Sequence, residues 1–161
     1  IRENRMNSKG FTLIELVVVI VILGILAVTA IPKYINLQAD AQTSTLEGVK
    51  AAMEGVAALV YGKSIIAGNQ KLSETNTPTP TIILTNGTVL IINHGYPRSN
   101  FFDWFNLLDT TEFLMTVTSD TKLLVYPKDL AVLPDASSDC ITIYEQATST
   151  SKPIITVNPC V

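Results

Sequence analysis

The feature that most constrains this chain is an apolar segment near its amino terminus. Of the 21 residues in 11–31, 17 are apolar, and Glu15 carries the only charge. As an α-helix, a segment of this length rises about 31 Å, which matches the roughly 30 Å hydrocarbon core of a membrane. Such a surface is unfavourable in water, so we expect lipid or other protein to cover it.

The flanks of the segment predict its orientation. Arg2, Arg5 and Lys9 precede it against the single acid Glu3. Basic flanks stay on the cytoplasmic side of a membrane. A single span would therefore place everything after Pro32 on the far side.

Three interpretations of the segment compete. A secretory signal peptide could be cleaved after Val28-Thr29-Ala30, but the apolar run is longer than usual and contains an acid. A plain signal anchor explains the length and leaves Glu15 unexplained. An acid costs about 2.5–3.5 kcal/mol at a membrane centre, less near a helix start, where the helix dipole favours negative charge. Glu15 could reach the headgroups, or it could pair with the amine created by cleavage between Gly10 and Phe11.

The sequence Lys9-Gly10-Phe11-Thr12-Leu13-Ile14-Glu15, with its apolar continuation to Pro32, resembles the processing motif of type IV pilins and pseudopilins. The short basic leader and the Gly–Phe junction are similar to the type IVa subclass. Two further stretches, Pro32-Lys33-Tyr34-Ile35-Asn36-Leu37-Gln38 and Gly95-Tyr96-Pro97, are most similar to mannose-sensitive hemagglutinin (MSHA) pilins.

The resemblance implies a role for five residues. Gly10 would end a leader removed by a prepilin peptidase, and Phe11 would become the N-methylated first residue. Glu15 would pair with the Phe11 amine of a neighbouring subunit. Gly24 and Pro32 would bracket the part of the helix that loosens in the filament.

The implied protein is a structural subunit of a type IV pilus and not an enzyme. It would be a precursor in the inner membrane and then a homo-oligomeric filament outside a Gram-negative cell, made with the pilus assembly machinery, for adhesion, attachment or motility. A type II secretion pseudopilin and a monomeric exported binding protein are the alternatives. The leader would be residues 1–10, with Met6 as the expected translation start, and its removal leaves eight basic and thirteen acidic side chains.

Residues 32–68 change from uniformly apolar to striped. Leu46, Val49, Met53, Val56 and Val60 keep the three–four spacing of one helix face, which predicts docking on a sheet. Gly68-Asn69 is a helix stop. A helix from Thr12 to Ala67 would be roughly 80 Å long. Because a chain of this size cannot bury such a rod, the length itself favours polymerisation.

Residues 69–161 predict a β-rich head, which makes the fold class α+β: a long amino-terminal helix packed on an antiparallel sheet. Asn86-Gly87 is a strong hairpin signal inside 81–92. Residues 121–126, 140–144 and 154–157 read as strands. The aromatic stretch 100–108 predicts a short helix capped by Ser99, with most of its apolar side chains in the core, or else an exposed edge for subunit contacts or adhesion.

Cys140 and Cys160 are the two cysteines of the chain. Antiparallel pairing of 140–146 with 153–160 about Thr150 would set them opposite each other, where a disulfide fits. Export to an oxidising compartment favours the same bond. The resemblance also implies a carboxy-terminal disulfide loop.

Other candidate sites have plainer explanations. His94 lies in a turn-like loop and is expected to face solvent. The segment from Asp135 to Asp139 fits no standard calcium loop and predicts a solvated turn. The hairpin explains Asn86 without glycosylation. With a formal charge of −3 and a pI near 5.0, nucleic acid is not an expected partner, and we expect no metal and no cofactor.

Overall fold

The computed structural model describes residues 10–109, 111–119, 121–130 and 132–161. It divides the chain into two compact units, residues 1–38 and 39–161. Helix α1 (Leu13–Ala67) contributes its front part to the first unit and its back part to the second. The leader residues 1–9, including Met6, lie outside the described residues.

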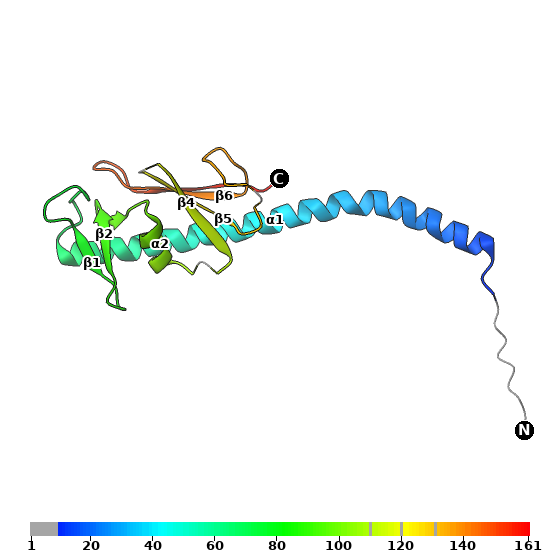
Figure 1. The fold of residues 1–161 in the computed structure, drawn as a ribbon, viewed down its shortest axis with the longest axis horizontal. Helices are drawn as coiled ribbons and strands as arrows, with labels where there is room; N and C mark the ends of the chain where they lie inside the picture. Colours follow the sequence, from blue (N-terminus) through cyan, green and yellow to red (C-terminus); the bar gives the residue numbers. More distant parts are fainter. Residues whose placement is uncertain (1–9, 110, 120, 131) are drawn as a thin grey trace, which may run out of the picture. The chain divides into compact units, whose positions relative to one another are not determined.

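The second unit contains two antiparallel sheets and a short helix beside the back part of α1 (Figure 1). Strands β1 (Thr81–Ile83), β2 (Val89–Asn93) and β3 (Tyr96–Pro97) form the first sheet. Helix α2 (Phe101–Leu107) follows. Strands β4 (Phe113–Ser119), β5 (Lys122–Pro127), β6 (Ile141–Glu145) and β7 (Ile154–Asn158) form the second sheet in chain order. The predicted α+β fold is confirmed, with two sheets instead of one.

The striped face of α1 packs against the two sheets, as predicted. Met53 is fully buried in a cluster with Trp104 and Tyr144, and Val60 is buried against the first sheet. Trp104 is anchored at its polar end as well, because its Nε1 donates to the Arg98 carbonyl at 2.9 Å. The helix stop at Gly68 is also confirmed, with φ at +71°.

The predicted disulfide joins Cys140 and Cys160, but the predicted register is wrong by one residue. Ile141 pairs with Asn158, which aligns Cys140 with Pro159. Cys140 has a positive φ of 61° and donates its backbone N–H to the Pro159 carbonyl. Because Cys140 is left-handed, β6 begins only after it, and the disulfide does not need directly opposed strand positions. The Cys160 N–H donates to Thr43 Oγ1 at 2.9 Å, which attaches the chain end to α1.

The short aromatic helix corrects two expectations. Its cap is Asn100, whose side chain accepts from the Phe102 N–H, and not Ser99. Of the aromatic residues, Trp104 is buried, whereas Phe101, Phe102 and Phe105 are exposed. A helix of only seven residues has one face toward the core, so the other aromatic side chains lie outside, as the alternative expectation had it.

The hairpin at Asn86-Gly87 forms, with a loop of different type. Leu84 donates to the Thr88 carbonyl, and Gly87 donates back to the Leu84 carbonyl with φ at +84°. This is a turn followed by a left-handed glycine, and not a two-residue turn. The Asn86 side chain accepts from the Thr88 N–H, so the turn accounts for this residue. Strands β3 and β4 were not predicted.

A partly buried group of ion pairs connects three segments of the second unit. Arg98 donates to Asp103 at 2.9 Å, and its other nitrogen lies 3.6 Å from Glu74 in the loop after α1. Gln146 at the end of β6 donates to Glu74 and accepts from the backbone N–H of Ser99. The network holds the 69–80 loop against α2 and the second sheet.

We expect Met53→Ala to destabilise the second unit by about 2–5 kcal/mol, because it leaves a cavity beneath Trp104. Leu59→Ala is the matched control, since Leu59 is 73% exposed on the same helix. Urea unfolding of the full chain in detergent, followed by the near-ultraviolet signal of Trp104, measures both. Equal midpoints for Met53→Ala and the wild type would contradict this packing.

Burial raises the pKa of Asp103 above its ordinary value of 3.8, and the Arg98 guanidinium offsets the rise only in part. The folded state therefore binds this proton more tightly than the unfolded chain does. The protonated Asp103 side chain therefore adds to the free energy of unfolding below pH 3.8. This contribution is lost as the pH rises through the folded-state pKa. We expect the unfolding free energy of the wild type, minus that of Asp103→Asn, to fall over this window. Urea unfolding at a series of pH values tests it; a difference that grows with pH would show that Arg98 outweighs burial.

Candidate functional site

The start of α1 forms a reciprocal hydrogen-bonded cap. Thr12 precedes the first helical residue, and its backbone N–H donates to Glu15 Oε2 at 2.8 Å. The Thr12 hydroxyl donates to the same oxygen at 2.7 Å and accepts from the Glu15 N–H at 3.3 Å. This is a capping box, in which a hydroxyl residue and an acid three positions later satisfy each other's free backbone donors.

Sequence reasoning missed this cap, although the Thr-x-x-Glu spacing carries its signal. The cap gives Glu15 a structural role within its own chain. Among the described residues, no cationic group lies in an ion pair with its carboxylate. The cationic partner expected from the sequence is therefore not supplied by this part of the chain.

The proposed cleavage junction lies next to the cap. Gly10 and Phe11 precede the helix, and Phe11 is 78% exposed. A junction outside regular structure leaves its backbone accessible, which a peptidase requires. The structure thus brings Gly10, Phe11 and Glu15 into one short segment.

Gly24 and Pro32 lie farther along α1, which is continuous through both. A methyl group at Gly24 would meet nothing within 4 Å, so internal packing does not explain this glycine. Pro32 lies in the helix interior and lacks the N–H that would close a helical hydrogen bond. Both residues remain local weak points of the helix.

The front part of α1 is long and apolar enough to cross a membrane, and its apolar side chains are exposed. A signal sequence can also be long and apolar enough to meet this criterion. The distinction depends on processing, because a signal peptide is removed and a membrane-anchored helix is kept.

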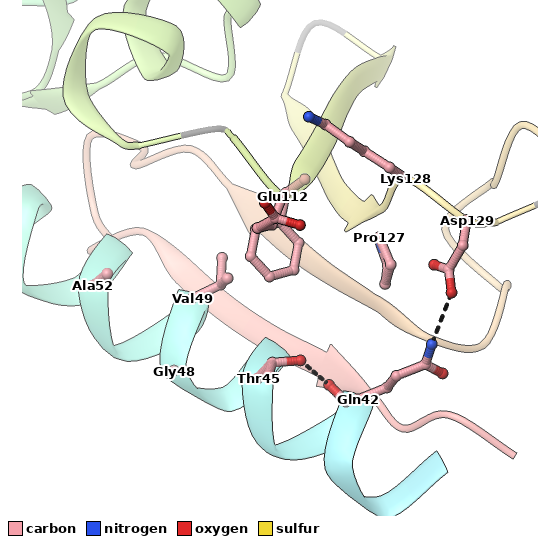
Figure 2. A pocket seen from close by; sticks show the side chains of 10 residues that line it. Gln42, Thr45, Gly48, Val49, Ala52, Glu112, Pro127, Lys128 and Asp129 are labelled. Atoms are coloured by element: carbon pink, nitrogen blue, oxygen red, sulfur yellow. Dashed lines mark hydrogen bonds between the residues drawn. The ribbon is translucent and has the colours of Figure 1, made fainter. Parts of the chain in front are cut away.

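A surface groove lies in the second unit, where α1 faces the ends of β4 and β5 (Figure 2). It has a volume of about 750 Å³, and Val49, Phe113 and Pro127 are among its apolar lining residues. At one end, Gln42 reaches across to donate to Asp129 at 3.0 Å (Figure 2). At the rim, Lys128 donates to the Thr111 carbonyl. These rim groups are held by internal bonds, and no ion pair joins the described acids and lysine that line the groove.

The remaining candidates from the sequence have structural roles. Asp135 accepts hydrogen bonds from the N–H and hydroxyl of Ser137, which is the expected turn, and these bonds lower its pKa. His94 is half-buried with φ at 49°, so the expectation of a solvent-facing loop histidine is only partly met. No group of three or more potential metal ligands occurs among the described residues.

Comparison with known proteins agrees with these features. Residues 5–31 match the family model for the prokaryotic N-terminal methylation motif. The chain is 40% identical over 98 residues to the type IV major alpha-pilin of Moraxella bovis, covering 59% of this chain and 57% of the relative. It is 43% identical over 54 residues to the type IV narrow pilus major component PilA5 of Thermus thermophilus. This match covers 34% of this chain and 47% of the relative.

A third similar protein is the type IV major pilin PilA of Myxococcus xanthus, 51% identical over 45 residues, covering 27% of this chain and 20% of the relative. The chain thus spans about half the length of the first two relatives and less of the third. No solved structure matches it significantly. Three findings agree with one another. They are the methylation motif, the similarity to several major pilins and the long helix packed on antiparallel sheets. These findings show that the chain is similar to type IV pilins, most clearly in its amino-terminal part.

Proposed function

We propose that the chain is a structural subunit of a type IV pilus and has no enzymatic activity. The observation that carries the proposal is the capped, exposed apolar helix directly behind the Gly10–Phe11 junction. Such a helix is stable as a unit, yet its surface needs lipid or neighbouring helices around it. The separate core of the second unit provides the part that stays in water.

The proposed sequence of events begins in the inner membrane. Residues 11–31 hold the precursor there, and a prepilin peptidase cleaves after Gly10. The new amine of Phe11 is methylated. With the assembly machinery, subunits then leave the membrane, and their apolar helices exchange lipid for one another in the extracellular filament, which keeps that surface dry throughout.

Glu15 is proposed to guide docking by pairing with the Phe11 amine of a neighbouring subunit. The two Thr12 donors both use Oε2. A carboxylate has about four acceptor positions, so Oε1 can accept from an ammonium while the cap stays formed. Gly24 and Pro32 are proposed to be the points between which the helix loosens in the filament.

The proposed subclass is a type IVa pilin of the MSHA kind. It is supported by the short basic leader, the Gly–Phe junction and the Pro32–Gln38 and Gly95-Tyr96-Pro97 stretches. The disulfide between Cys140 and Cys160 favours a pilus subunit over a secretion pseudopilin. Electron microscopy of a strain that lacks the chain distinguishes the major subunit, whose loss removes all fibres.

Processing gives the first test. We expect the mature chain, purified from cells and analysed by mass spectrometry, to begin at N-methylated Phe11, because the junction precedes the helix cap. Replacing Gly10 with a residue larger than alanine should leave the leader attached. A mature chain that begins at Ile31 would instead identify a secretory signal peptide and exclude the pilin function.

A second test separates the two roles of Glu15. Glu15→Gln keeps a capping side chain and removes the charge, because glutamine also occurs at this position of a capping box. Thr12→Ala removes the two cap bonds of the hydroxyl and keeps the charge. We expect Glu15→Gln to reduce surface fibres at least tenfold by electron microscopy, and Thr12→Ala to have the smaller effect.

Immunoblotting of membranes controls for the amount of each variant. Normal fibres in Glu15→Gln would exclude charge pairing as the assembly role of this residue. A stronger loss in Thr12→Ala than in Glu15→Gln would show that helix capping matters more than charge.

A further inference from the structure

A tight hairpin lies against α1 on the side of the second unit where the helix ends. His94 and Gly95 join β2 to β3, and both have positive φ, of 49° and 87°. Asn93 pairs with Tyr96 across this two-residue turn. A methyl group on Gly95 would lie 2.8 Å from the ring of Tyr61 and 2.9 Å from the hydroxyl of Ser64. The close approach therefore requires glycine, and a left-handed histidine accompanies it.

This hairpin places Tyr96 on Tyr61 of α1. The two rings stack with centroids 4.6 Å apart and an angle of 13° between their planes. The two tyrosines line two adjoining surface hollows, a larger one of about 470 Å³ and a smaller one of about 380 Å³. Lys152 also lines both hollows. Burial raises the pKa of Tyr96, so its hydroxyl remains protonated and can donate.

The charges around the hollows are mainly basic. In the described part of residues 39–161, Lys50 and Lys122 form ion pairs with acids, and Lys63 and Lys128 donate to backbone carbonyls. Lys71 and Lys152 have no such partner there, and both line the smaller hollow with His94. Glu54, in the larger hollow, is the acid that lines this surface. The unpaired lysines of the described part of residues 39–161 therefore lie in one place, in a chain with a net charge of −3.

Neutral polar groups outnumber the charges at this place. Thr148, Ser149, Thr150 and Ser151 line the smaller hollow with four consecutive hydroxyls, of which that of Thr148 hydrogen-bonds to those of Thr150 and Ser151. Gln70 lines the same wall, and its buried amide oxygen accepts no hydrogen bond from the described residues. Hydroxyls and an amide beside aromatic rings suit a ligand that is rich in hydroxyl groups.

We propose that the Tyr61–Tyr96 surface binds an acidic oligosaccharide, with sugar rings against the tyrosines and carboxylates on Lys71 and Lys152. Tyrosine offers both an apolar ring face for C–H groups and a polar hydroxyl. Charge-assisted bonds from two lysines would select a sugar acid over a neutral sugar. A nucleic acid is less suited, because its binding relies on many phosphate contacts and the chain is acidic overall.

The test is titration calorimetry of the full chain in detergent with trigalacturonate as the probe. Its methyl ester is the neutral control, and a short oligothymidylate of similar charge is the nucleic-acid control. We expect saturable binding of trigalacturonate and binding of the ester weaker by about tenfold or more, as the loss of charge-assisted bonds implies. The oligothymidylate should bind more weakly than the sugar acid at the same ionic strength.

Two variants of equal charge locate the site. The double substitution Lys71→Gln, Lys152→Gln should weaken trigalacturonate binding by at least about tenfold. Lys122→Gln with Lys128→Gln removes the same charge from another surface and should leave binding unchanged. Near-ultraviolet circular dichroism confirms that both proteins are folded.

Absent binding, equal losses in the two double variants, or equal affinity for the ester would each overturn the proposal. Tighter binding of oligothymidylate through the same lysines would replace the sugar with a nucleic acid. None of these results depends on filament formation, because the measurement uses unassembled protein.

Discussion

The structure depends on one constraint, which is that the apolar surface at the front of α1 lacks cover from its own chain. From Leu13 to Ile31 the large side chains are exposed in the described structure. At about 25 cal/mol per Å² of apolar area, such a surface is strongly unfavourable in water. The chain cannot remove this cost by folding, so the environment or other copies must do so. In the proposed function, a membrane and then a helical filament would cover this surface in turn.

This constraint also explains why the second unit carries a complete core of its own. The same helix that is apolar on all sides before Pro32 buries one face after Gln38, where Leu46 and Met53 are fully covered. Thr142 donates to the Leu46 carbonyl, and Cys160 donates to Thr43, so sheet and chain end are both bonded to the helix. A subunit of the proposed filament would need a folded part that remains stable when its other part changes surroundings. The disulfide adds to this stability by restricting the unfolded chain.

Much of this fold could be predicted from the sequence because its signals are local and periodic. The helical stripe through Met53, the hairpin at Gly87 and the disulfide partners follow from spacing and turn chemistry. The β6–β7 register could not be predicted, because it depends on Cys140 leaving the strand conformation. The burial of Trp104 but not of Phe102 depends on which face of α2 meets Tyr144, and a helix this short shows no clear period.

The site shows the same division between local signals and tertiary arrangement. The Thr12–Glu15 cap is a four-residue pattern and was open to prediction. The stacking of Tyr96 on Tyr61 joins residues 35 positions apart through a turn whose conformation the sequence did not reveal. Lys71 and Lys152 come together only because the loop after α1 and the β6–β7 connection meet beside that turn. Such a surface is invisible to any pattern confined to neighbouring residues.

The cap resolves an apparent conflict over Glu15. If its carboxylate were needed for the helix start, pairing it with another subunit would weaken its own helix during assembly. Both Thr12 bonds end on Oε2, however, and a carboxylate accepts at both oxygens. The cap also holds the side chain in one orientation, so less conformational freedom would remain to be lost in the proposed docking of a neighbour. Helix capping and charge pairing can therefore reinforce each other on one residue.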